Sequence, residues 1–173
     1  ASDLDLSAFD DEDGSVSSAL SCRGPGGADL TVEDEYERQL DALFEKRAST
    51  REKALASVIV MLRVEFRYEE AVQHNETLVA RCLLGLKRGG PIESSRSSQL
   101  LGLHILTLGT GNESLFQSLR PELERAALGS NQGKGPEVQA AAVDSLALAA
   151  FVLAGEEEGT QGVMRRLRML WKL

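Results

Sequence analysis

Residues 51–58 read REKALASV, residues 96–103 read RSSQLLGL and residues 139–146 read QAAAVDSL, and these three stretches align without gaps. Successive stretches lie 45 and then 43 residues apart. The aligned columns hold apolar residues at Leu55, Leu100 and Val143 and small residues at Ser57, Gly102 and Ser145. A repeat of about 40–47 residues is typical of armadillo and HEAT proteins. The spacing therefore predicts an all-α fold, a right-handed armadillo/HEAT-like α-solenoid of about three helix pairs plus a last helix.

Helical periodicity surrounds each of these stretches. Alternately amphipathic and strongly apolar helices are expected at residues 33–46, 49–66, 70–88, 94–108, 113–128, 136–154 and 156–173. Ser49 and Glu52 have the spacing of a capping box, which predicts the start of the second helix. The column of small residues lies on the apolar helices. We therefore expect these helices to approach one another closely there, so that a larger side chain at Gly102 would overpack the contact.

Charge divides the chain into two regions. Residues 1–37 hold 11 of the 27 acidic residues and one of the 19 basic residues, although the whole chain has a net charge of −8. Residues 1–32 are rich in Ser, Asp and Gly and poor in large apolar side chains, a composition that favours disorder. We expect a disordered acidic arm over residues 1–32 and a helical repeat domain over residues 33–173. The arm is either an interaction tail or a solubilising linker.

The last expected helix has no apolar partner helix after it. Because terminal repeats normally present a polar outer face, we expect either that the natural protein continues into a further domain or that residues 156–173 fold back as a cap. The longest apolar run, residues 146–154, is far shorter than the roughly 20 residues that a bilayer span needs. No membrane association is therefore expected.

Enzymatic motifs are missing from the sequence. The stretch GSNQGKG at residues 129–135 has the wrong spacing for a phosphate-binding loop and lacks Ser or Thr after its lysine. The two cysteines, Cys22 and Cys82, and the two histidines, His74 and His104, have no metal-ligand spacing. We expect no catalytic residues, cofactor, metal or small-molecule substrate. Cysteines without such spacing favour a reducing, intracellular setting in the cytoplasm, the nucleus or both.

Two polar residues interrupt apolar stretches. His104 lies within the apolar run of residues 100–108, where we favour a core or groove-lining histidine with one hydrogen bond over a functional ligand. Asp144 lies among Ala and Leu residues. It is expected at a water-exposed edge, with a groove-facing or ion-paired position as the alternative.

Basic residues form two clusters that could contact phosphates or an acidic partner. The first surrounds the turn before the second helix, and the second lies within a narrow arc of the last helix. For the first cluster a solvated surface is the favoured interpretation, and for the second both interpretations stay open. The candidate binding residues are Lys46, Arg47, Arg51, Lys53, Arg165, Arg168 and Lys172.

Longer stretches make the chain recognisable. Residues 46–58 (KRASTREKALASV), 86–90 (LKRGG) and 100–123 (LLGLHILTLGTGNESLFQSLRPEL) resemble the N-terminal domain of the interferon-related developmental regulator family over roughly residues 33–155. The acidic, serine-rich arm also resembles that family's N-terminus. The resemblance implies a non-enzymatic regulator, acting as a transcriptional co-regulator or as a ribosome-associated factor that dampens translation.

Two functions are expected from these observations. The leading one is an adaptor that regulates gene expression through protein contacts, with transcriptional co-regulators as partners. The alternative is a factor that binds the ribosome or rRNA through basic faces and represses translation. The two differ in salt dependence, because phosphate contacts weaken steeply as salt rises.

Overall fold

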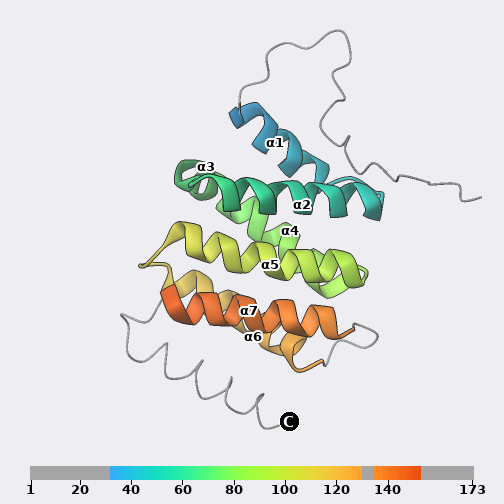
Figure 1. Cartoon of the computed structure of the whole chain (residues 1–173), viewed down its shortest axis with the longest axis vertical. Coiled ribbons are helices and arrows are strands. Elements are labelled where there is room, and N and C mark those ends of the chain that lie inside the picture. The colour runs from blue at the N-terminus through green and yellow to red at the C-terminus, as the bar shows by residue number, and fades with distance from the viewer. Residues whose placement is uncertain (1–31, 130–134, 153–173) are drawn as a thin grey trace, which may run out of the picture. The chain divides into compact units, whose positions relative to one another are not determined.

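The computed structural model describes residues 32–129 and 135–152, which are helical and contain no strand (Figure 1). These residues belong to one unit that covers residues 31–173. The helices are α1 (Val32–Ala42), α2 (Ala48–Val64), α3 (Tyr68–Gln73), α4 (Asn75–Arg88), α5 (Pro91–Leu108), α6 (Glu113–Ala127) and α7 (Pro136–Val152). The predicted all-α class is confirmed for the described residues.

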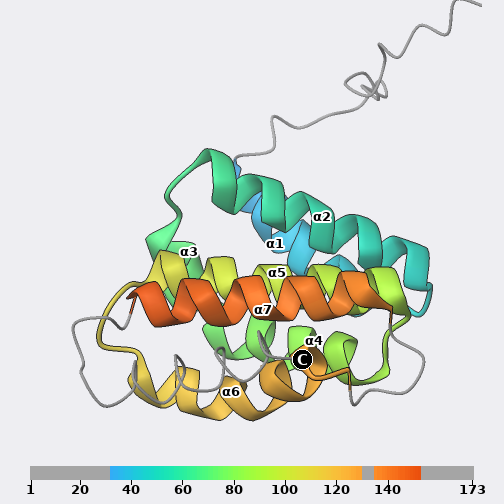
Figure 2. The ribbon, with the colours of Figure 1, turned by 60° about the horizontal axis from the view of Figure 1, so that its bottom comes forward.

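The helices form two layers. α2, α5 and α7 lie side by side in the first layer, in which α5 contacts both α2 and α7 (Figures 1 and 2). On the other side α1 packs on α2, α4 on α5, and α6 on α7. Both views show α2, α5 and α7 running in the same direction, so their C-terminal ends lie along one edge. Each of the three aligned stretches of sequence thus lies within one of the three helices of the first layer.

The core lies between these layers, as the repeat columns predict. Leu55 and Leu100 are fully or almost fully buried, and Val143 is partly buried and packed against the core. α5 has the most buried residues among the described helices, including the serines Ser94, Ser97 and Ser98. Burying a hydroxyl is costly unless it finds a hydrogen-bond partner. Ser94 Oγ donates to the carbonyl of Gly85 at 2.9 Å.

The column of small residues sets the distance between α5 and α7. A Cβ atom placed on Gly102 would lie 2.8 Å from Ser145 Oγ and 2.9 Å from Ser145 Cα. Ser145 Oγ in turn donates across the helix contact to the carbonyl of Ser98 at 2.6 Å. The expected close approach at Gly102 is present, and it depends on a glycine opposite a small hydrogen-bonded side chain.

The helix expected over residues 70–88 is wrong as a single element. The chain turns at His74, which separates α3 from α4 with φ −104° and ψ 14°. In α3 the buried residue is Ala71, whereas the apolar residue Val72 is exposed. Arg67 fixes the approach to α3 through ion pairs with Glu65 and Glu70. The residue that α3 buries is therefore not part of one apolar stripe shared with α4.

The predicted capping box is also wrong. α2 begins at Ala48, so Ser49 lies inside the first turn, and its N-cap residue Arg47 makes no side-chain capping bond. Arg51 closes the preceding turn instead, by donating from Nη1 to the carbonyls of Glu45 at 2.9 Å and Lys46 at 2.8 Å. A guanidinium therefore organises this turn in place of a hydroxyl.

Two further helix ends differ from the expectation. α1 ends at Ala42, and Phe44 beyond it is half exposed beneath the guanidinium of Arg81, whose Cζ lies 3.5 Å from the ring centroid. α5 begins at Pro91, before the expected residue 94, because the polar residues Glu93 and Ser94 are buried within the helix. The expected helix 156–173 lies outside the described residues.

Candidate interaction surfaces

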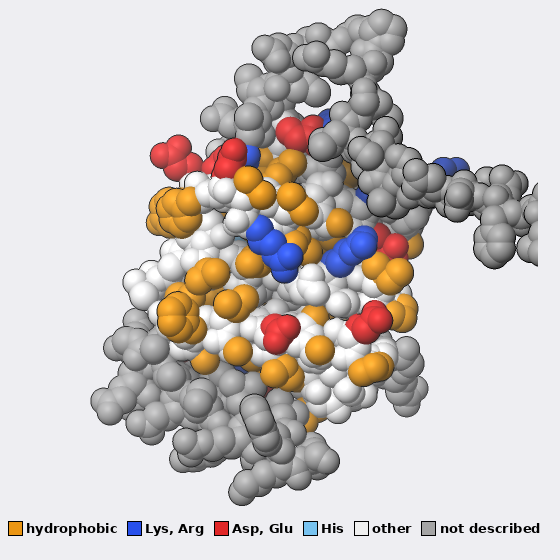
Figure 3. All heavy atoms as spheres, in the orientation of Figure 1, with side chains coloured by type: hydrophobic (Ala, Val, Ile, Leu, Met, Phe, Trp, Pro, Cys, Tyr) orange, Lys and Arg blue, Asp and Glu red, His pale blue; other side chains and the backbone are white. Residues whose placement is uncertain are grey.

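One side of the first layer is not covered by the second layer. We call it the inner face. Three helices contribute to it, and their side chains recur at helical spacing with apolar and charged groups mixed (Figure 3). Its exposed and half-buried residues are Val60, Arg63, Val64, Arg96, Gln99, Leu103, Leu106, Asp144, Ala147, Leu148 and Phe151.

A hollow of about 430 Å³ joins the three helices on the inner face. Arg63 comes from α2, Leu103 from α5, and Asp144 and Leu148 from α7. Asp144 is exposed, as expected, but it lines this hollow, which is the groove-facing alternative rather than an edge position. A hollow with apolar walls and one charge of each sign suits a partner segment that carries both apolar and polar groups.

The C-terminal end of each helix of the first layer exposes a large apolar side chain. Val64 on α2 is 74% exposed, Leu106 on α5 is 40% exposed and Phe151 on α7 is 74% exposed. Single exposed apolar residues are normal, but contiguous ones mark interaction sites. Because α2, α5 and α7 run in the same direction (Figure 1), the helix ends that carry these three residues lie along one edge of the layer.

The first predicted basic cluster is divided by the structure. Lys46, Arg47 and Lys53 are exposed. Arg51 instead forms two hydrogen bonds with the buried carboxylate of Glu93, from Nε at 2.7 Å and from Nη2 at 2.8 Å. This pairing raises the pKa of Arg51. Arg51 therefore holds α2 against the start of α5, and most of its donors are used inside the protein.

Two arginines that the sequence did not single out join this cluster. Arg81 and Arg88 of α4 line the same 210 Å³ hollow as Arg51, together with Glu45 and Glu93. Their spacing of seven residues equals two helical turns, which places both on one face of α4. The spacing of Arg81 and Arg88 could be seen in the sequence. Their position beside the turn before α2 could not, because it depends on how α4 packs. The second predicted cluster, Arg165, Arg168 and Lys172, lies outside the described residues.

His104 has the structural environment that was favoured for it. Its ring is fully buried, and Nε2 lies 2.8 Å from Asn75 Oδ1 of α4. Burial lowers the pKa of His104 to about 4. Cys82 is also fully buried, and burial raises the pKa of its thiol. Both groups are held in their uncharged forms within the core, where they pack rather than react.

The described part of the chain lacks two other kinds of site. Over residues 32–129 and 135–152 no group of three or more His, Cys, Asp or Glu residues could hold a metal ion. None of the helices described in those ranges is long and apolar enough to cross a membrane. The features that stand out there are surfaces and surface hollows.

The described residues thus define an all-helical domain whose candidate sites are surfaces. The chain belongs to the interferon-related developmental regulator family, whose sequence pattern matches residues 7–172. The resemblance seen over residues 33–155 is confirmed, and the match extends into the acidic arm and through the last predicted helix. Membership indicates a role in developmental regulation. No solved structure matches this chain.

Proposed function

We propose that this protein is a non-enzymatic, armadillo-like helical-repeat scaffold that regulates gene expression through protein contacts made on its inner face. The alternating layers and the repeat of about 44 residues support a solenoid, in which each helix pair buries its apolar side against the next pair. Solenoids of this kind present extended surfaces to other macromolecules.

One observation carries the proposal. Val64, Leu106 and Phe151 are exposed near the C-terminal ends of α2, α5 and α7, within one helical turn of Arg63, Leu103 and Leu148, which line the 430 Å³ hollow. Apolar surface left in water costs about 25 cal/mol per Å² relative to its burial, so a partner that covers these side chains gains that free energy. The occupant that fits is a partner protein segment with apolar side chains flanked by polar ones. We propose transcriptional co-regulators as the source of that segment.

A pair of tethered reporter assays tests this function. The chain is fused to a DNA-binding domain at a reporter promoter, and separately to an RNA-binding coat protein on the reporter mRNA. We expect the promoter tether to change the reporter mRNA level. A change confined to the protein made per mRNA would favour the translational alternative, and no change in either arm would refute regulation of gene expression.

Matched variants assign the effect to the inner face. Phe151→Ser removes an exposed side chain of that face, whereas Leu128→Ser removes one that is 54% exposed at the end of α6, in the other layer. We expect Phe151→Ser to abolish the reporter effect and Leu128→Ser to preserve it. Equal behaviour of the two variants would exclude the inner face as the partner site.

The alternative function, ribosome association that represses translation, is supported by a different observation. Lys46, Arg47 and Lys53 are exposed near the hollow that contains Arg81 and Arg88. Phosphate contacts predict cosedimentation with ribosomes that is lost between low and physiological salt. Arg88→Ala should weaken cosedimentation without changing the promoter reporter. Salt-insensitive or absent cosedimentation would exclude this alternative.

A further inference from the structure

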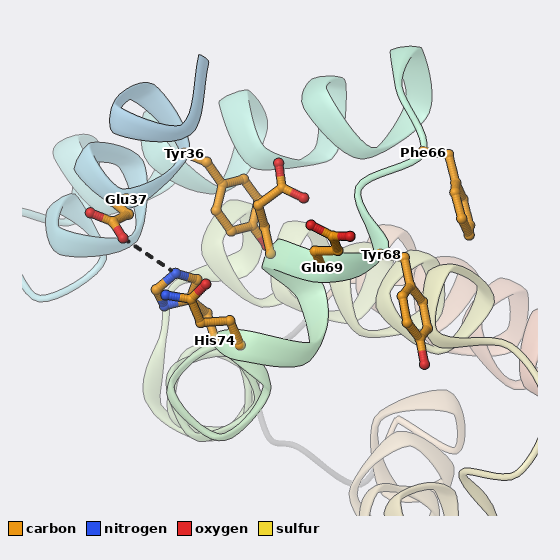
Figure 4. Close-up of a pocket in the computed structure, with 8 residues that line it drawn as sticks. Tyr36, Glu37, Phe66, Tyr68, Glu69 and His74 are labelled. Atoms are coloured by element: carbon orange, nitrogen blue, oxygen red, sulfur yellow. Dashed lines mark ion pairs between the residues drawn. The ribbon is translucent and has the colours of Figure 1, made fainter. Parts of the chain in front are cut away.

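A third hollow opens at the opposite end of α2 from the basic hollow, where α1, the α2–α3 turn and α3 meet (Figure 4). Its volume is about 590 Å³, compared with 430 Å³ for the hollow on the inner face and 210 Å³ for the basic hollow. Its lining is aromatic and acidic rather than basic. The lining residues are Tyr36, Glu37, Phe66, Tyr68, Glu69, Glu70, Gln73 and His74.

An exposed aromatic pair forms one wall of this pocket. Phe66 is 80% exposed and Tyr68 is 47% exposed. Their rings stack with centroids 6.2 Å apart and planes 16° from parallel. Figure 4 shows the two rings side by side at the mouth of the pocket. Stacked rings with open faces attract cations through their electron-rich surfaces.

Carboxylates form the rest of the rim, and the neighbouring cations do not neutralise all of them. Glu70 is paired with the buried Arg67 at 2.9 Å. Glu37 lies 3.7 Å from His74 Nε2, and that imidazole is charged only when it is protonated. Glu69 is exposed and forms no ion pair with any residue that the structure describes. The pocket therefore keeps an excess of negative charge beside its aromatic wall.

The floor of the pocket contains a buried polar group without a partner. Tyr36 is fully buried, and its hydroxyl has no hydrogen-bond partner among the described residues. Figure 4 shows its side chain reaching from α1 into the space between Glu69 and His74. Its ring centroid lies 6.0 Å from that of His74. Buried hydroxyls are normally satisfied, so this oxygen is available to accept a hydrogen bond from a ligand donor.

We infer that this pocket binds the guanidinium group of an arginine carried by a basic segment of a partner protein. A guanidinium is planar and weakly hydrated, so it stacks on the face of Phe66 or Tyr68. At the same time its fork of N–H groups donates to carboxylates such as Glu69. A partner that reaches both this pocket and the exposed Val64 would carry an arginine close to an apolar residue.

Peptide binding to the full 173-residue chain tests this inference. The probe is a fluorescein-labelled peptide of glycine and serine with one central arginine, compared with the same peptide carrying citrulline, which has the same shape but no charge. Anisotropy should show that the arginine peptide binds about tenfold or more tightly than the citrulline peptide, with a lysine peptide in between. Equal affinity for the arginine and citrulline peptides would overturn the inference, as would no measurable binding of the arginine peptide.

Matched variants distinguish binding of the peptide in the pocket from nonspecific attraction of its positive charge to the acidic residues of the arm. Phe66→Ala and Glu69→Gln should each weaken binding of the arginine peptide about threefold to tenfold. Glu137→Gln makes the same charge change at an exposed position on α7 and should leave affinity unchanged. The three altered side chains are exposed, so circular dichroism should show unchanged folding. Equal losses in Glu69→Gln and Glu137→Gln would overturn the inference. The reporter assays for the inner face do not depend on this result.

Discussion

Replacing Gly102 with alanine is a direct test of the packing between α5 and α7. The new Cβ would meet Ser145 Oγ at 2.8 Å, Cα at 2.9 Å and Cβ at 3.0 Å. Because one of these atoms belongs to the backbone, rotation of the Ser145 side chain cannot relieve the contact, and the two helices must separate. Overpacking of a core costs about 1–3 kcal/mol, and alanine regains about 1 kcal/mol through its higher helix propensity. We expect a net loss of up to about 2 kcal/mol.

Gly85 provides the matched control for this prediction. A Cβ on Gly85 would also meet a serine hydroxyl, that of Ser97, but the next atom is 3.4 Å away. Ser97 Oγ has no hydrogen-bond partner among the described residues, so the side chain can rotate without losing a bond. Gly85→Ala should therefore be neutral or stabilise the protein by up to about 1 kcal/mol through helix propensity.

Thermal melts of the two variants measure the difference. In a domain of this size, 1 kcal/mol corresponds to about 2–4 °C in Tm, so Gly102→Ala should melt up to about 8 °C below the wild type while Gly85→Ala should not. In a Ser145→Ala background the cost of Gly102→Ala should shrink, because the nearest atom is gone. A Gly102→Ala variant as stable as Gly85→Ala would refute the close approach of α5 and α7.

Three further predictions concern buried polar groups. Arg51→Met leaves the carboxylate of Glu93 buried without its partner and should cost about 1–3 kcal/mol in urea unfolding, whereas an unchanged midpoint would show that the ion pair contributes nothing. The pKa of His104 is about 4 in the folded protein and near 6.5 when unfolded, so the unfolded state takes up the proton first as pH falls. Stability should therefore fall by up to about 3 kcal/mol between pH 6.5 and pH 4, and less so in His104→Gln; equal pH profiles would contradict this origin. In a Cys22→Ser background, the buried thiol of Cys82 should react with a thiol reagent only as fast as the protein opens, and rapid labelling without denaturant would refute its burial.

The repeat columns predicted the layer that organises the protein. Leu55 and Leu100 are in the core and Gly102 lies against Ser145, because apolar and small residues at a fixed period must face the same neighbours in each repeat. The exposure of Asp144 and the burial of His104 also followed from their surroundings in the sequence. Where apolar residues recur at a regular spacing, the sequence alone predicts which of them are buried.

The structure differs from the sequence prediction where residues distant along the chain decide the outcome. The helix was predicted to begin at residue 94, but it begins at Pro91, and Ser94 lies inside it with its hydroxyl bonded to the carbonyl of Gly85 in the preceding helix. Arg51 resembled a free surface cation, yet its partner Glu93 lies 42 residues away. The acidic pocket brings Tyr36 together with Phe66 and Tyr68, and no local pattern could place them side by side.

α5 lies between α2 and α7 and also contacts α3 and α4, so its amides are shielded on several sides. Native-state hydrogen exchange should therefore show a gradient: we expect α1, which contacts mainly α2, to exchange by fraying, and the middle of α5 to exchange only when the whole domain opens. Such a gradient lets a terminal helix detach and dock again without melting the centre. The difference between α1 and α5 is then set by the number of helices that each of them contacts.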